Sequence, residues 1–220
     1  LLRIEDSISE RVGEDIPEIN ISTIKDISVA PGDSVVWALS DSLIVSYNNL
    51  RNTVSKYPIP PCNAIDVGKD GTVWSGHTDG LVSYSEGIIT QHQDEHEQIE
   101  SDLLDLVCDD HGVVWFITET QLMSYDGEKF QTHIQFYSSS PIYNYIEEIA
   151  IDQNNTKWIV QKNALSTGGF SGGTTSTFND FVWKEHTELP GSIQQIIFED
   201  NLMWFHTGGP NVYRYHDSTY

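Results

Sequence analysis

The clearest pattern of apolar and polar positions lies in residues 62–92, where short alternating segments are separated by tight turns. Residues 62–67 alternate as a half-buried strand does, and the Asp70-Gly71 step that follows is typical of a hairpin turn. A second strand is predicted over residues 72–76, a third over 81–84 and a fourth over 87–92. Four short strands joined by tight turns predict one blade of a β-propeller.

A tryptophan in the second strand marks repeated copies of this unit. The copies contain Trp37, Trp74, Trp115, Trp158 and Trp204, at intervals of 37, 41, 43 and 46 residues. A period near 40 with strand-like content is typical of propellers. We therefore predict an all-β fold, a β-propeller of four-stranded antiparallel blades, over residues 24–57, 62–92, 103–133, 146–186 and 193–220. One large side chain per blade fills the wedge between neighbouring sheets, so the tryptophans are predicted to be structural blade markers.

The two ends of the sequence bear on the number of blades. Residues 1–4 resemble a third strand and residues 7–12 a fourth, whereas the last unit stops after its third strand. An N-terminal segment, residues 1–12, that completes the last blade would close a ring of five blades in one domain, residues 1–220. The alternative is a piece of a six- to eight-bladed propeller. Residues 168–177, rich in Gly, Ser and Thr, are predicted to be a flexible inserted loop.

Composition narrows the possible partners. The chain has 220 residues and a net charge of −22, from 33 acidic and 11 basic residues. This charge argues against binding to nucleic acid or to anionic membranes, and it suits a basic partner or a divalent cation. No run approaches the roughly 20 apolar residues of a membrane span, and no signal peptide is visible. The sequence starts at Leu1, as a processed protein or a piece of a longer one would.

Two cysteines, Cys62 and Cys108, are too few for a disulfide scaffold. In the predicted register they lie about 16 Å apart along neighbouring strands. Disulfides require Cα atoms within about 7 Å, so both thiols are predicted to be free and buried.

The repeat resembles the two-component-regulator propeller repeat. The residues that carry the resemblance are Ile65 to Trp74 with Gly80 to Tyr84, and the copy from Leu106 to Tyr125. The resemblance covers nearly the whole chain, although the copy around Trp204 lacks the turn glycine. It implies an extracytoplasmic sensor domain, periplasmic or secreted, and it transfers no catalytic residues. Tectonin-like lectin propellers use similar hairpins and are the second choice.

Candidate binding residues lie where a propeller presents its inter-blade connections and the turns between second and third strands. That face surrounds the central channel. The turns contribute polar side chains, and an aromatic connection between blades adds tyrosines suited to sugar stacking or a protein contact. The predicted ligand-binding residues are His77, Thr78, Asp79, Glu119, Tyr143, Tyr145, Lys162 and His206.

The densest group of potential metal ligands is His92, Asp94 and His96. We predict a solvated acidic loop there and no metal or cofactor, because no spacing dictates a coordination set. The hairpin acids Asp33, Asp70, Asp110 and Asp152 are predicted to serve shared turn chemistry rather than catalysis.

These observations favour a non-enzymatic propeller, a sensor or recognition module that binds a glycan, a peptide or a protein partner. One alternative is a propeller enzyme of the glycosidase or lyase type with its active site at the channel mouth. The other is a structural subunit of a larger assembly whose acidic surface meets a basic partner.

Overall fold

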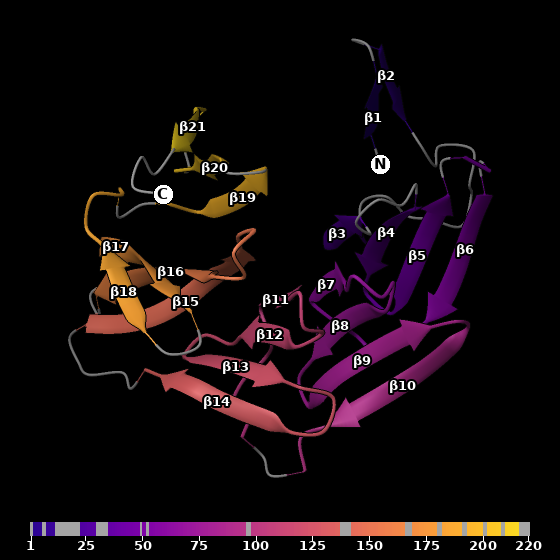
Figure 1. Ribbon diagram of the computed structural model, residues 1–220, viewed down its shortest axis with the longest axis horizontal. Coiled ribbons are helices and arrows are strands. Elements are labelled where there is room, and N and C mark those ends of the chain that lie inside the picture. The colour runs from indigo at the N-terminus through magenta and orange to yellow at the C-terminus, as the bar shows by residue number, and fades with distance from the viewer. Residues whose placement is uncertain are drawn as a thin grey trace.

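The fold is an all-β propeller in which five antiparallel sheets follow one another around a ring (Figure 1). The computed structural model describes residues 2–5, 8–11, 23–29, 35–48, 50–51, 53–95, 98–136, 142–165, 169–179, 182–190, 193–199, 202–207 and 210–215. Each sheet is one blade, and its strands run outward from the centre in chain order. The sequence prediction of a five-bladed propeller is confirmed.

The strands fall into blades as follows. Blade 1 contains β3 (Asp26–Val29), β4 (Val35–Ser40), β5 (Leu43–Asn48) and β6 (Thr53–Pro58). Blade 2 contains β7 (Ala64–Val67), β8 (Val73–His77), β9 (Gly80–Ser85) and β10 (Ile88–Gln93). Blade 3 contains β11 (Asp105–Cys108), β12 (Val114–Ile117), β13 (Gln121–Tyr125) and β14 (Phe130–Gln135). Blade 4 contains β15 (Ile142–Ile151), β16 (Lys157–Leu165), β17 (Gly169–Phe178) and β18 (Trp183–His186). Blade 5 contains β19 (Gln195–Glu199), β20 (Leu202–His206) and β21 (Val212–Tyr215).

The N-terminal segment forms a hairpin of its own. β1 (Leu2–Glu5) and β2 (Ile8–Arg11) pair antiparallel in a two-stranded sheet. Figure 1 shows this hairpin rising beside blade 1, and in the described part of the chain β21 ends the three-stranded sheet of blade 5. Closure of the ring by residues 1–12 therefore stays a prediction.

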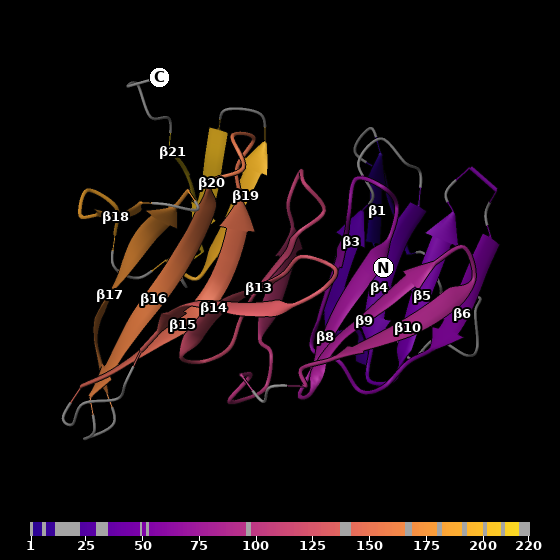
Figure 2. The ribbon, with the colours of Figure 1, turned by 60° about the horizontal axis from the view of Figure 1, so that its bottom comes forward.

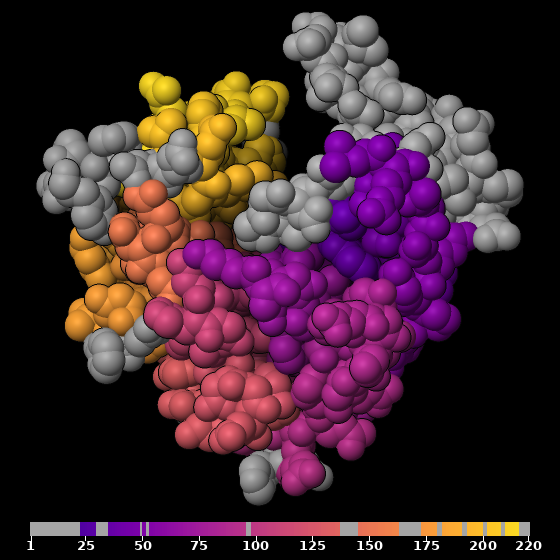
Figure 3. Space-filling view, turned by 45° about the vertical axis from the view of Figure 1, so that its right-hand side comes forward, coloured from indigo at the N-terminus to yellow at the C-terminus, as the bar shows by residue number. Residues whose placement is uncertain are grey.

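Apolar side chains are buried between successive blades, in four separate clusters. Leu39 and Ile65 belong to the cluster between blades 1 and 2, and Leu106 to the one between blades 2 and 3. Ile149 lies in the cluster between blades 3 and 4, and Ile196 in the one between blades 4 and 5. Figure 3 shows these blades meeting in a continuous surface from indigo to orange. Core formation thus depends on stacking neighbours rather than on any single sheet.

Four of the five blade tryptophans pack in the apolar core between blades, and Trp204 is in none of these clusters. Trp37, Trp74, Trp115 and Trp158 each pack against or within the cluster that joins their blade to the next. The indoles of three of them also meet a histidine of the outer strand, at centroid distances of 5.0 Å for Trp74–His92, 4.6 Å for Trp115–His133 and 4.8 Å for Trp158–His186. These three histidines therefore have equivalent contacts in their blades.

Acids at equivalent positions accept the indole N–H of three tryptophans. One of these acids is Glu199, whose Oε2 lies 3.2 Å from Nε1 of Trp204. Asp109 Oδ2 accepts the indole N–H of Trp115 at 3.0 Å, and Asp152 Oδ2 accepts that of Trp158 at 3.0 Å. In blade 3 the acid in this role is Asp109, whereas the predicted Asp110 forms an ion pair with Lys69. Asp70 accepts the Thr72 amide within its own turn, as predicted, and Asp33 lies outside the described residues.

The prediction of a loop over residues 168–177 is wrong. Residues 169–177 form most of β17, whose backbone pairs with β16 from Phe178 opposite Lys157 to Gly169 opposite Leu165, and residue 168 lies outside the described residues. Figure 2 shows β15, β16 and β17 as the longest strands. A Gly/Ser/Thr segment lacks apolar alternation, but a long partner strand supplies the hydrogen-bond ladder that fixes it.

The predicted free cysteines are confirmed: Cys62 is buried and Cys108 half-buried, and neither forms a disulfide. Within the described residues, no helix has the length and apolar character needed to span a membrane.

Candidate ligand site at the central channel

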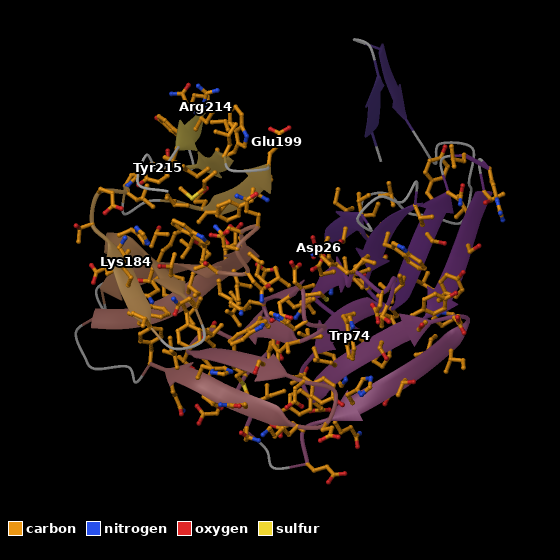
Figure 4. All side chains as sticks on the ribbon, in the orientation of Figure 1. Asp26, Trp74, Lys184, Glu199, Arg214 and Tyr215 are labelled. Atoms are coloured by element: carbon orange, nitrogen blue, oxygen red, sulfur yellow. The ribbon has the colours of Figure 1, made fainter. Side chains whose placement is uncertain are left out.

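A cavity of about 380 Å³ lies where the five inner strands converge. Every inner strand contributes to its wall, from Asp26 and Ser28 on β3 to Gln195 on β19. Its carboxylates come from four strands and are those of Asp26, Asp66, Asp105, Glu147 and Glu148, with Lys25 and Asn63 as further polar groups. Figure 4 shows Asp26 at this inner edge and Trp74 farther out, within blade 2.

Four of these carboxylates join one blade to the next. Asp26 Oδ2 accepts the amide of Ile65 at 2.9 Å, and Asp66 Oδ2 accepts the amide of Cys108 at 2.7 Å. Asp105 Oδ2 accepts the amide of Ile149 at 3.1 Å. Glu148 Oε1 accepts the amide of Ile196 at 2.8 Å. We call these contacts the inter-blade clasps; each runs from an acid of one blade to an amide of the following blade.

Burial raises the pKa of all four clasp acids. The pKa of Asp105 reaches about 7, because burial and the charges of Asp26 and Asp66 outweigh its hydrogen bonds from backbone amides. That of Glu148 reaches about 8, because burial and the charges of Asp105 and Glu147 outweigh the Ile196 amide and Lys162. The pKa values of Asp26 and Asp66 are also raised, chiefly by burial. Near neutral pH Glu148 is therefore largely protonated and Asp105 partly so.

A β-bulge places two successive glutamates on the channel. The register of β15 against β16 shifts between Ile146 and Glu148. Because a bulge interrupts the alternation of side chains, Glu147 and Glu148 both line the cavity. Glu148 forms a clasp, whereas Glu147 forms an ion pair with Lys162.

Three of the predicted binding residues meet at the top of blades 3 and 4. The pKa of Tyr145 is raised by burial and by the charges of Glu147 and Glu119. Lys162, which is buried, neutralises Glu147 in the same group. Glu119, Tyr145 and Lys162 therefore form a polar rim next to Glu147 of the cavity wall.

The remaining predicted residues lie elsewhere. His77 ends β8, is buried, and accepts the Asp79 amide on Nδ1 at 3.2 Å, while Thr78 and Asp79 are exposed. Burial lowers the pKa of His77. His206 ends β20 and is half-buried. Tyr143 was expected in a connection but belongs to β15, opposite Ala164; its side chain is outside the described residues.

The weak metal candidates have other roles. Both ring nitrogens of His92 are engaged, one with Ser83 Oγ at 2.9 Å and the other with the Tyr125 hydroxyl at 3.0 Å. Asp94 Oδ2 accepts the amides of Gln98 and Ile99. His96 lies outside the described residues, and among those described no cluster of three His, Cys, Asp or Glu residues is placed to hold a metal.

Sequence reasoning missed the channel acids. The available signal was an acid that recurs at the same position of the inner strand in three blades. Asp26, Asp105 and Glu148 each lie three residues before the last residue of their strand. Those last residues are Val29, Cys108 and Ile151. A charged side chain that recurs at one position of an inner strand indicates a specific partner.

The fold is shared with extracellular sensor domains. The extracellular domain of a putative hybrid two-component system from B. thetaiotaomicron superposes with a TM-score of 0.61 at 16% identity, over 84% of this chain and 26% of that one. A second such domain from the same organism gives 0.55 at 13% identity, over 93% and 35%. A gluconolactonase from Xanthomonas campestris gives 0.60 at 8% identity, over 88% and 73%.

These likenesses show the fold of the chain, a β-propeller that also occurs in bacterial extracellular sensor domains and in a gluconolactonase. The chain spans about a quarter to a third of the length of those sensor domains. No family model and no curated protein matches the sequence.

Proposed function

We propose that this chain is a non-enzymatic sensing or recognition propeller that binds part of a glycan, peptide or protein at its central channel. The observation that carries the proposal is the polar cavity to which all five inner strands contribute. Its volume is within the range of ligand pockets, at the lower end, and fits one sugar or one side chain of a larger ligand.

The chemistry of the wall favours a ligand rich in hydrogen-bond donors. Carboxylates accept N–H and O–H groups, and the ionised ones attract positive charge. The polar rim of Glu119, Tyr145 and Lys162 extends this surface, so that a ligand larger than the cavity gains further contacts. The extracellular setting of the similar sensor domains supports an extracytoplasmic location.

The test is a binding screen with immobilised glycans and peptides, followed by calorimetry on each hit. Lys25→Gln and Glu147→Gln change the charge of the wall, and we expect each to weaken binding at least about tenfold. Lys184→Gln is the matched control, because Lys184 is exposed on the outer strand β18, far from Asp26 in Figure 4. Equal affinity in all three variants would place the ligand elsewhere and contradict the proposal.

A propeller enzyme is the second candidate. Asp105 and Glu148 have pKa values near neutrality, which suits general acid–base catalysis, and the gluconolactonase shares the fold. Their clasp hydrogen bonds favour a structural role instead. Assays with lactones and glycosides decide between the two: turnover that Glu148→Gln abolishes would favour the enzyme.

A further inference from the structure

Among the described residues, no blade covers one face of the inner strand of blade 1. Ile27 and Val29 of β3 are equivalent to Ile65 and Val67 of β7, which are buried against blade 1. The residues equivalent to Ile27 in blades 3, 4 and 5 are Leu106, Ile149 and Ile196, and each is buried against the preceding blade. On blade 1, however, Ile27 is 53% exposed and Val29 54% exposed.

Blade 5 has the complementary open face. Ile197 of β19 is equivalent to Val107 and Ala150, which pack against the cluster shared with the following blade. Ile197 is 57% exposed. Both open faces border the gap between blades 5 and 1 in Figure 1. The exposed faces of β3 and β19 have apolar residues at the same positions as the faces that are buried between the other blades.

Blade 5 does not carry the acid that would clasp blade 1. The position of Asp26, Asp105 and Glu148 is Gln195 in β19, and the position of Asp66 is Ile197. The inner strand of blade 5 therefore offers no carboxylate at either clasp position. The faces of blades 5 and 1 are each suited to a neighbour, but not to one another.

The position of the missing acid follows from blades 2 and 3. In blade 3 the Leu106 amide already donates to Asp105 of its own strand, at 2.9 Å. Asp66 of blade 2 therefore accepts the next amide on that side of the strand, which is the amide of Cys108. In blade 1 the Ile27 amide is likewise held by its own Asp26, at 2.8 Å. The equivalent of Cys108 is Val29, whose amide points to the same side of its strand. The blade before blade 1 needs a carboxylate at the position of Asp66.

The hairpin β1–β2 has the form of the outer half of such a blade. Its strands pair from Leu2 opposite Arg11 to Glu5 opposite Ile8. The outer strands of blade 2 have the same short connection, with Ser85 opposite Ile88. In chain order β2 directly precedes blade 1, as β10 directly precedes blade 3.

We propose that the open face of β3 is the docking surface for a further blade, whose outer strands are β1 and β2 and whose inner strand presents an acid to the Val29 amide. Its two inner strands are supplied by additional chain. The apolar side chains of that blade cover Ile27 and Val29 on one side and Ile197 on the other. A second copy of the 220 residues does not fit, because its blade 5 has the same Gln195 and Ile197.

The first test measures the open face in the 220-residue chain. Ile27→Asp is expected to shift Tm by less than about 2 °C, because the side chain is exposed, whereas the equivalent Ile65→Asp lowers Tm by more than about 8 °C. Equal losses would show that blade 5 already covers β3 and would overturn the proposal. So would a concentration-dependent dimer, in sedimentation, that Ile27→Asp abolishes.

The second test supplies the missing strands. A copy of residues 60–80, which form the two inner strands of blade 2, is fused directly ahead of Leu1. We expect hydrogen exchange of the Val29 amide to slow at least about tenfold and Ile27→Asp now to lower Tm by more than about 8 °C. The control carries Asp66→Val in the copied strand, which gives that position the side chain of Val107, and loses the protection of Val29. A fusion that leaves Val29 unprotected contradicts the proposal.

Discussion

The imidazole of His186 stacks on the indole of Trp158, with ring centroids 4.8 Å apart and planes inclined at 23°. His186 also forms hydrogen bonds with Thr177 and Glu188. His92 and His133 repeat this arrangement with Ser83 and Ser124 on the third strand of their blades. The unit ties the outer strand of a blade to the tryptophan of its second strand, and so explains the histidine in the outer strand of blades 2, 3 and 4.

Replacing His186 by alanine tests this unit. We expect His186→Ala to lower the free energy of unfolding by about 2 kcal/mol, through loss of the stack and of a buried hydrogen bond. Chemical denaturation measures the change. The control is His111→Ala, at an exposed turn, with an expected effect below about 0.5 kcal/mol. Equal effects would mean that the stack adds nothing.

A buried ion pair lies between the turn of blade 3 and the second strand of blade 4. Asp109 Oδ2 is 3.6 Å from the ammonium of Lys157, which is fully buried and lies 4.1 Å above the ring of Trp115. Asp109→Ala removes the carboxylate but leaves the buried charge, so we expect a loss of about 3–5 kcal/mol in denaturant unfolding.

The double variant Asp109→Ala/Lys157→Met is the control for the ion pair. Because it removes both charges, it is expected to be more stable than Asp109→Ala alone. A double variant less stable than Asp109→Ala would show that Lys157 does not depend on Asp109.

The raised pKa of Glu148 makes stability depend on pH. Its pKa is about 8 in the fold against 4.5 ordinarily, so the folded state binds more protons between these values. The stabilisation is complete below about pH 4.5 and is lost as pH rises toward 8, at up to about 1.4 kcal/mol per pH unit. Asp105, at about 7, acts in the same direction.

Glu148→Gln keeps an oxygen for the Ile196 amide and removes the titration. We expect a flatter dependence of unfolding free energy on pH between 5 and 8 and a gain in stability at pH 8. Parallel curves for the variant and the original chain would contradict this prediction.

Gly80 is expected to be the least replaceable glycine of blade 2. Its φ is +143°, and a Cβ would lie 2.1 Å from the carbonyl oxygen of His92. We expect Gly80→Ala to cost at least about 3 kcal/mol, because two backbones must separate. At Gly71, with φ of +82° and no atom within 4 Å of a Cβ, alanine costs about 1 kcal/mol. Thermal unfolding compares the two, and similar losses would rule out the steric explanation.

The fold was predictable from sequence because its signals are local. The Asp-Gly turn before Trp74 and the alternation around it repeat within each blade, so one repeat predicts the others. The third strand of blade 4 was not predictable, since the Gly and Thr residues of β17 resemble a linker until β16 pairs with them.

The candidate site was predictable only in part. Glu119 lies in the predicted turn between the second and third strands of blade 3, whereas Lys162, predicted in the equivalent turn of blade 4, lies within β16. The clasps were not predictable, because Asp26 and Ile65 are separated by a whole blade in sequence and meet only when the two inner strands lie side by side.

The inter-blade clasps give the ring a direction. Each runs from an acid to the amide of the following blade, and the acid stands at one of two positions according to which amide the next strand leaves available. If a blade were exchanged for another, its acid would face an amide that already donates a hydrogen bond within its own strand, or an amide of the next blade would lack an acceptor. Recombination among these repeats is therefore restricted, because the positions of the acids in the inner strands fix the order of the blades.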